Sequence, residues 1–177
     1  MTTMADIDGS RIRLEPATLD QLDAYFRDPD QLAEALRSPL PAGWPFDVTA
    51  FLWVANALQR APEAAARWMY WAFDAETGRL IGDGGLRSEA AGALELSYEV
   101  AEEFRGRGYG APLVDALCRL GFEDAAIERV EVHTRLDDEA SPPTLLRAGF
   151  TRVGVQEPAD PEVARALVAW VRERPAS

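Results

Sequence analysis

Lysine is missing from the 177-residue sequence, and all 18 of its basic residues are arginines. A lysine nucleophile, a Schiff-base lysine and the lysine of a P-loop are therefore excluded. Cys118 is the only cysteine, so an internal disulfide is excluded too, and nothing indicates an oxidising compartment. His133 is the only histidine, and a lone histidine is more often structural than catalytic. No metal site can be assembled around it, so we expect no metal.

Long apolar runs are missing as well. The most apolar stretch, Phe51 to Leu58, is interrupted by Asn56 and is far too short to cross a membrane. The first ten residues carry acids and no apolar core, which is unlike a signal peptide. We therefore expect a cytoplasmic protein that does not act at membranes.

The net charge of −12 argues against nucleic acid as the main ligand, because affinity for a phosphate backbone needs a basic face. The acidity suits a cationic partner such as an amine, and it also suits a protein that is merely kept soluble by its charge.

Apolar residues make up 47% of the chain and charged residues 27%, as in ordinary soluble globular proteins. We expect one α+β domain over residues 1–177, with residues 1–9 flexible. Apolar periodicity and turn residues predict the order of elements. The predicted strands are 10–16, 68–73, 79–86, 94–100, 129–135, 151–155 and 163–172; the predicted helices begin after Thr18, at Asp30, at Asp47 or Thr49, at Gly108 and at Ser141.

Several details of this order can be tested. The third helix, which ends near Arg60 before Pro62, is expected to bury Phe51, Leu52, Val54, Ala55 and Leu58. Glycines at 82, 84 and 85 predict a bulge or a close backbone approach in their strand, and residues 88–93 are predicted to form a turn. Residues 163–172 also fit a helix by period, although a strand is favoured for their second half. The helix at 108–125 lies between two strands, which predicts a parallel crossover after an antiparallel meander.

The stretch Arg105-Gly106-Arg107-Gly108-Tyr109-Gly110 opens the helix that carries Leu113 and Leu117. A glycine-rich turn at a helix start leaves backbone N–H groups unpaired, and the helix dipole favours an anion there. A P-loop is excluded because Ala111 and Pro112 stand where its Lys and Ser/Thr would be. A dinucleotide fold formally matches Gly106-x-Gly108-x-x-Ala111, but too few residues remain after Ala111 for its strands. The third class is acyl-coenzyme A binding.

The stretch from Glu95 to Val100, followed by Arg105-x-x-Gly108-x-Gly110, resembles the acetyl-CoA motif of the GNAT N-acetyltransferases. The surrounding pattern is similar to the RimJ/RimL-like branch, whose best-known members acetylate N-terminal amines of ribosomal proteins. The resemblance covers roughly residues 10–155. It implies a mixed, mostly antiparallel sheet that is splayed between its fourth and fifth strands, with helices on both faces.

The same resemblance implies the activity. Acetyl-CoA would be the acyl donor, and the acceptor would be a protein N-terminus or a small polyamine or aminoglycoside, acetylated by direct transfer. The alternative is a module that binds an acyl-CoA with little or no catalysis. Dimers are common in the family, so a homodimer is one of the states to test.

The resemblance also implies site residues. Backbone N–H groups of Arg105, Gly106, Arg107, Gly108, Tyr109 and Gly110 would hold the pyrophosphate, with Tyr98 and Val100 beside the pantetheine. The arginine side chains are either secondary phosphate contacts or ordinary surface charge. Glu95 is the first candidate for a base, alone or through water, and Glu99 is the second. A solvent-facing role is the alternative for Glu95.

Four further residues bear on the expected site. Ser141 falls at the family's serine near the sulfur, where it either hydrogen-bonds the departing thiolate or caps its helix. Asp138 stands where many members have an asparagine that contacts the coenzyme, and a carboxylate can only accept hydrogen bonds. Leu145 replaces the general-acid tyrosine of other branches. Trp44, on the loop from Pro39 to Phe46, is a candidate to line the acceptor pocket.

Overall fold

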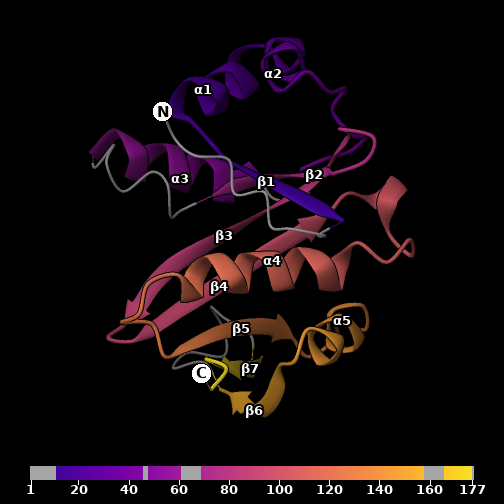
Figure 1. Cartoon of the computed structure of the whole chain (residues 1–177). Coiled ribbons are helices and arrows are strands. Elements are labelled where there is room, and N and C mark those ends of the chain that lie inside the picture. Colours follow the sequence, from indigo (N-terminus) through magenta and orange to yellow (C-terminus); the bar gives the residue numbers. More distant parts are fainter. Residues whose placement is uncertain (1–10, 46–47, 61–68, 158–165, 177) are drawn as a thin grey trace. The chain divides into compact units, whose positions relative to one another are not determined.

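The computed structural model describes residues 11–45, 48–60, 69–157 and 166–176. These residues form an open seven-stranded sheet in the order β1-β2-β3-β4-β5-β7-β6, together with five α-helices (Figure 1). The elements are β1 (Ile12–Pro16), α1 (Leu19–Arg27), α2 (Pro29–Leu36), α3 (Val48–Arg60), β2 (Tyr70–Asp74), β3 (Leu80–Ala90), β4 (Ala93–Val100), α4 (Gly110–Phe122), β5 (Arg129–Arg135), α5 (Ser141–Arg147), β6 (Thr151–Gln156) and β7 (Leu167–Glu173).

The chain divides into two compact units. The first comprises Met1–Gly85 and Tyr98–Ala116, and the second comprises Leu86–Ser97 and Leu117–Ser177. The expected flexible segment, residues 1–9, lies outside the described residues. None of the described helices combines the length and the apolar character that a membrane span needs.

The first unit is built on an antiparallel ribbon. β2 pairs with β1 on one side and with β3 on the other. α1 begins with a capping box, in which the Thr18 hydroxyl accepts from the Gln21 N–H and the Gln21 side chain accepts from the Thr18 N–H. The Gln21 side chain also accepts from the indole of Trp71, whose ring packs edge-on against Phe51 and Trp44. An aromatic core therefore joins the ribbon to the helices before it.

The predicted bulge is confirmed in β3. Ala72 pairs with Gly82 whereas Phe73 pairs with Leu80, so Ile81 is the extra residue. A Cβ on Gly82 would lie 2.0 Å from the carbonyl oxygen of Glu99 in β4. Glycine is needed here because the two backbones approach too closely for any side chain.

The second unit contains the parallel crossover. Residues Ala93–Glu95 of β4 pair in parallel with Arg129–Glu131 of β5, and β7 lies antiparallel between β5 and β6. Since the residues from Leu167 to Glu173 form a strand, the helical alternative is wrong for that part of the segment. α5 ends as predicted, because Gly149 adopts a φ of +81° and the N–H of Phe150 donates to the carbonyl of Leu145.

Four local predictions are corrected. Residues 88–90 belong to β3, which leaves a turn at Ala91-Gly92 in place of the predicted 88–93. Helix α4 begins at Gly110 and ends at Phe122, two residues later and three earlier than predicted, since Gly108 has a φ of +81°. Leu52 is 49% exposed and does not join the buried face of α3. Thr49 lies inside α3 and is not its N-cap; Asp47, Pro62 and Trp68 lie outside the described residues.

Candidate active site

The glycine-rich loop from Arg105 to Gly110 belongs to the first unit and has the backbone of an anion site. Gly106 and Gly108 have φ values of +71° and +81°, a region that side chains disfavour. Among the described residues, no acceptor lies within hydrogen-bond distance of the N–H groups of residues 106–111. A Cβ on Gly106 would meet no atom within 4 Å, so the space beside the loop is open. These features fit a pyrophosphate, which needs bare N–H donors and close backbone approach.

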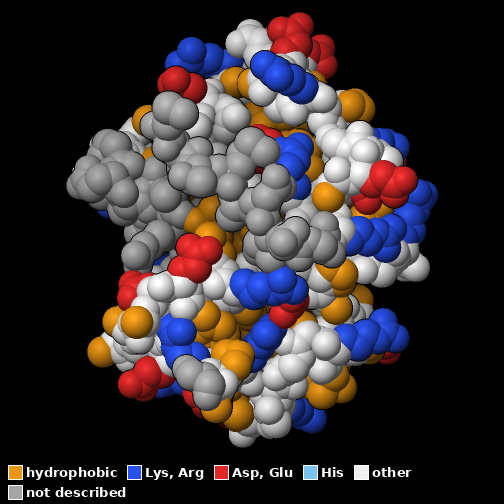
Figure 2. Space-filling view, in the orientation of Figure 1, with side chains coloured by type: hydrophobic (Ala, Val, Ile, Leu, Met, Phe, Trp, Pro, Cys, Tyr) orange, Lys and Arg blue, Asp and Glu red, His pale blue; other side chains and the backbone are white. Residues whose placement is uncertain are grey.

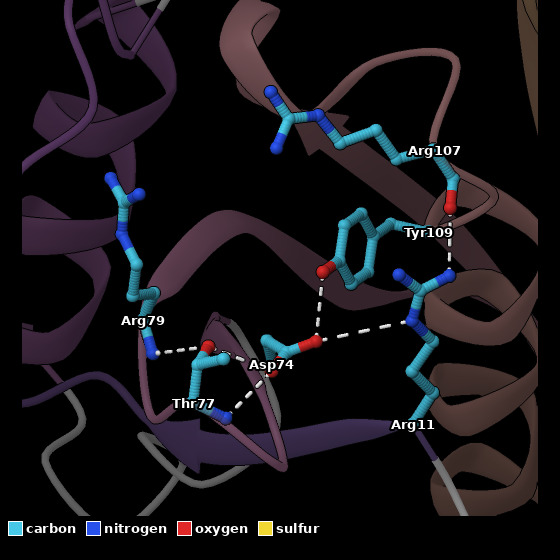
Figure 3. Close-up of polar contacts among 6 residues, drawn as sticks. All are labelled: Arg11, Asp74, Thr77, Arg79, Arg107 and Tyr109. Carbon is cyan, nitrogen blue, oxygen red and sulfur yellow. Dashed lines mark hydrogen bonds and ion pairs between the residues drawn. The ribbon is translucent and has the colours of Figure 1, made fainter.

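The conformation of the loop is held by Arg11, Asp74, Thr77, Arg107 and Tyr109, which we call the loop cluster (Figure 3). The Tyr109 hydroxyl donates to Asp74 Oδ2 over 2.8 Å. The Arg11 guanidinium lies 3.9 Å from the centre of the Tyr109 ring, and its Nη1 donates to the Arg107 carbonyl over 2.7 Å. Arg11, which directly precedes β1, and Asp74, the last residue of β2, therefore hold the loop at Arg107 and at Tyr109.

Asp74 is the centre of the loop cluster. Its Oδ1 accepts from both the N–H and the hydroxyl of Thr77, each over 2.7 Å. Burial by itself opposes ionisation of this carboxyl, but the hydrogen bonds from Thr77 and Tyr109 and the charge of Arg11 outweigh it and lower the pKa. Asp74 thus holds the loop as a fully partnered anion.

The side chains of Arg105 and Arg107 have partners within the protein. Arg105 Nε donates to the Val100 carbonyl over 2.9 Å, which closes the bend after β4. The Arg107 guanidinium lies 5.6 Å from the centre of the Phe104 ring. The backbone N–H of Arg105 also has a partner, since it donates to the Glu102 carbonyl over 3.1 Å, so the expected pyrophosphate contact of this N–H is wrong and the bare N–H groups of the loop are those of residues 106–110.

The second unit brings Glu95 together with His133 and Arg87, which we call the imidazole cluster. Glu95 pairs with Glu131 across the parallel β4–β5 ladder, and His133 lies two residues further along β5, on the same face. His133 Nδ1 lies 3.1 Å from Glu95 Oε1, and Arg87 donates to Glu95 Oε2. His133 Nε2 is buried and has no hydrogen-bond partner among the described residues.

Asp138 and Ser141 also meet in the second unit, at the start of α5. Asp138 Oδ1 accepts from the N–H groups of Ala140 and Ser141, each over 2.9 Å. Asp138 therefore performs the capping that was one prediction for Ser141, which is the first residue of the helix. The Ser141 hydroxyl has no partner among the described residues.

Trp44, the candidate acceptor residue, is only 6% exposed and packs with Phe51 and Trp71 in the first unit. Its indole N–H donates to Asp83 Oδ2 over 2.8 Å. Desolvation, together with the negative charge of Glu99, raises the pKa of Asp83 to about 8, although the Trp44 hydrogen bond lowers it. A carboxyl with a pKa this high is more common at functional sites than elsewhere.

Residues 11–151 match the family model described as the acetyltransferase (GNAT) domain. The chain belongs to the GNAT acetyltransferase family. The matched span contains the glycine-rich loop, the loop cluster and the imidazole cluster. No curated protein sequence matches the chain significantly. The described residues contain no group of three or more His, Cys, Asp or Glu side chains arranged to hold a metal ion.

Solved structures of acetyltransferases share the fold. RimL, a ribosomal L7/L12 alpha-N-protein acetyltransferase in complex with coenzyme A, has 19% identity and a TM-score of 0.67 over 97% of this chain and 98% of that chain. A chimera of spermidine N-acetyltransferase SpeG from Vibrio cholerae and hSSAT has 15% identity and a TM-score of 0.65, and the match covers 93% of this chain and 96% of that chain. AAC(6')-Ib, in complex with paromomycin and acetyl-CoA, has 19% identity and a TM-score of 0.62, and the match covers 92% of this chain and 93% of that chain.

Three residues of interest were missed as site candidates in the sequence. The sequence favours a structural role for His133. However, the predicted crossover makes the strand of His133 parallel to the strand of Glu95, and this parallel pairing places the two residues beside each other. Asp83 lies between Gly82 and Gly84, where the sequence predicted only a bulge, so nothing in the sequence indicated its raised pKa. Asp74 was predicted only as a turn residue, because its contact with Tyr109 spans 35 positions.

Proposed function

We propose that the protein is an N-acetyltransferase that moves the acetyl group of acetyl-CoA directly to a primary amine. The observation that carries the proposal is the loop from Arg105 to Gly110, with positive φ at two glycines and bare N–H groups at the start of α4, in a chain of the GNAT family.

The chain's own residues divide the work as follows. The N–H groups of Gly106, Arg107, Gly108, Tyr109 and Gly110 bind the pyrophosphate, and the loop cluster keeps them oriented before the ligand arrives. The end of β4 at Tyr98 and Val100 lies along the pantetheine; the Val100 carbonyl accepts one hydrogen bond from Arg105 and keeps a second lone pair. Ser141, whose hydroxyl has no partner among the described residues, donates to the departing thiolate. Asp138 contributes through the Ser141 N–H that it holds in place.

The acceptor is an amine with access to acidic groups. The chain carries a net charge of −12, and in the first unit the negative charge of Glu99 acts on Asp83, which accepts a hydrogen bond from Trp44. On the face shown in Figure 2, however, the described acidic side chains are interspersed with arginines and form no single acidic surface. A small amine or a protein N-terminus, which needs only a local acidic site, therefore suits this protein. The RimJ/RimL-like branch remains part of the proposal, supported by the motif and by the family match.

Two measurements test the proposal. Isothermal titration with acetyl-CoA should give a saturable heat, and a panel of primary amines should release free coenzyme A thiol that is detected with a colorimetric thiol reagent. Mass spectrometry of the acetylated products of a cell lysate would then identify the acceptor class. Absence of both heat and thermal shift with acetyl-CoA would contradict the proposal.

A binding module with little catalysis is the second candidate, because Asp138 brings a negative charge in place of an amide donor. In that case acetyl-CoA binds, yet no amine in the panel releases thiol.

A homodimer is also proposed: Val153 and Val155 are exposed on β6, which is the last strand in the sheet order. Light scattering after size exclusion would give the mass of the particle in solution.

A further inference from the structure

The imidazole of His133 has one nitrogen with a partner and one without. Nδ1 lies 3.1 Å from Glu95 Oε1, whereas Nε2 is buried with no hydrogen-bond partner among the described residues. A buried polar atom that lacks a partner costs about 1–3 kcal/mol. A histidine with only a structural role gains nothing from that cost, so the orphaned nitrogen points to a ligand.

The Glu95 contact determines which nitrogen carries the proton. An ionised carboxylate only accepts hydrogen bonds, so Nδ1 must be the protonated nitrogen of the neutral ring. Nε2 then carries the free lone pair and can only accept a proton or a hydrogen bond. Glu95 itself is held from two sides, since its other oxygen accepts from Arg87.

We propose that His133, oriented by Glu95, is the general base that takes the proton from the acceptor amine. The inference rests on the proposed acetyl transfer and reassigns the base, for which Glu95 was the first candidate. As the amine nitrogen bonds to the acetyl carbon and the carbon–sulfur bond breaks, Nε2 takes one amine proton, directly or through one water. The imidazolium formed is stabilised by the Glu95 carboxylate, and its proton leaves to the thiolate or to solvent. Glu95 is then a positioning residue.

The surroundings of the ring support this role. On its own strand, Glu131 is hydrogen-bonded to Arg129, and Arg135 to Asp137. Across the antiparallel β5–β7 ladder, the residue opposite His133 is Ala169, and the neighbours on that face are Leu167 and Val171, which do not ionise. Among the described groups, Glu95 from β4, with Arg87 behind it, is the charged contact of the imidazole.

Nuclear magnetic resonance tests the tautomer directly, because His133 is the only histidine and yields one imidazole spin system. In protein labelled with ¹⁵N-histidine, the neutral ring is expected to carry its proton on Nδ1. In Glu95→Leu the ring is expected to lose this preference. A proton on Nε2 in the unchanged protein would overturn the proposal.

Kinetics test the catalytic role. His133→Asn keeps an amide N–H near the position of Nδ1 but has no base at Nε2. We expect its kcat to fall about 10²–10⁴-fold, the usual contribution of a general base. The acid limb of the wild-type kcat profile should vanish in the variant. Acetyl-CoA affinity and thermal midpoint should change little. Glu131→Gln, on the same face of β5, is the matched control and should keep wild-type kcat.

The outcomes separate the two proposals. If the wild-type protein releases thiol and His133→Asn does so equally fast with an unchanged pH profile, the base assignment is wrong and the function stands. If His133→Asn loses activity only because it no longer folds, its thermal midpoint and NMR spectrum reveal this, and His133→Gln, with Glu95→Leu, repeats the test. If the wild-type protein binds acetyl-CoA but acetylates no amine, the proposed function fails, and the imidazole tautomer is still measurable.

Discussion

The loop cluster and the imidazole cluster differ in the kind of polar group that they leave without a hydrogen-bond partner. In the loop cluster, both carboxyl oxygens of Asp74 have partners, and the bare groups are N–H donors that face open space. In the imidazole cluster, the carboxyl oxygens of Glu95 are equally well partnered, but an acceptor, His133 Nε2, is left alone. Unpaired donors suit an anion, and an unpaired basic nitrogen suits a proton. The two vacant hydrogen-bonding positions thus match the two partners of an acetyl transfer.

The largest expected effect is on acetyl-CoA binding at the glycine-rich loop, the first of the two regions compared. Gly108→Asp places a carboxylate at the loop, where its Cβ would lie 3.5 Å from Arg11 Nη1 and would draw Arg11 away from the Arg107 carbonyl. We expect the Kd for acetyl-CoA to rise by about 100-fold or more, equivalent to about 2.7 kcal/mol. Titration calorimetry measures it. Gly43→Asp, at a similar φ of +68° with open space, controls for backbone strain. Unchanged binding in Gly108→Asp would refute the cradle.

Removal of the anion at the centre of the loop cluster should be the next largest effect. Asp74→Asn loses a charge that accepts from Thr77 and Tyr109, and we expect about 2 kcal/mol less stability at pH 7. Because folding lowers the pKa of Asp74, its stabilisation is present above the ordinary value of 3.8 and is lost as the pH falls through the folded value. Urea unfolding at pH 7 and at pH 3 should therefore show a smaller difference at pH 3; an equal difference would exclude the charge as the cause.

Asp83 sharpens the comparison, because it is a desolvated carboxyl of the first unit that accepts a hydrogen bond from Trp44 and has a negative neighbour, Glu99. Its pKa is raised to about 8, so the folded protein keeps a proton that the unfolded chain releases. The stability present below pH 3.8 is lost as the pH rises to about 8. Asp83→Asn should thus stabilise the protein by about 2 kcal/mol at pH 8 and hardly at all at pH 3.5. Urea midpoints at both pH values measure this; a loss of stability at pH 8 would contradict it.

A smaller effect is expected from the outer member of the imidazole cluster. Arg87→Met removes one of the two partners that orient Glu95, and we expect kcat to fall about 10-fold. Stability should change by less than about 0.5 kcal/mol, because the pair is partly exposed. Steady-state kinetics and chemical unfolding separate the two quantities. Arg129→Met, which breaks the neighbouring pair with Glu131, is the control and should leave kcat unchanged.

The smallest effect concerns the start of α5. Asp138→Ala removes the acceptor for the N–H groups of Ala140 and Ser141, and such a cap is worth about 1 kcal/mol. Asp138→Asn keeps an acceptor and should lose less than half of that. If acetyl-CoA also binds Asp138→Asn a few-fold more tightly, the negative charge of Asp138 opposes the coenzyme; weaker binding would contradict that view.

Much of the fold could be predicted, because the signals are local. The capping box at Thr18, the bulge at Gly82 and the end of α5 at Gly149 each depend on residues a few positions apart. Errors occurred where two local signals competed. Ser141 is a good cap by type, but Asp138, three residues earlier, accepts from the N–H groups of Ala140 and of Ser141 itself, so Ser141 is the first residue of the helix. Residues 88–90 have turn-forming neighbours, yet they continue β3 because the turn needs only Ala91 and Gly92.

The sequence alone determined the local features on which the proposed donor site rests. The glycines that adopt positive φ and the helix start lie within one short segment, and the absence of lysine excludes a P-loop, so no distant contact is needed to propose a pyrophosphate loop there. Only the tertiary structure decided the state of the ionisable groups. The low pKa of Asp74 depends partly on Tyr109 and Arg11, which are far from it in sequence. The high pKa of Asp83 depends on desolvation and on Glu99, and the orientation of His133 depends on Glu95, 38 positions away. Desolvation and hydrogen bonding act through space, and the chain sets them only once it has folded.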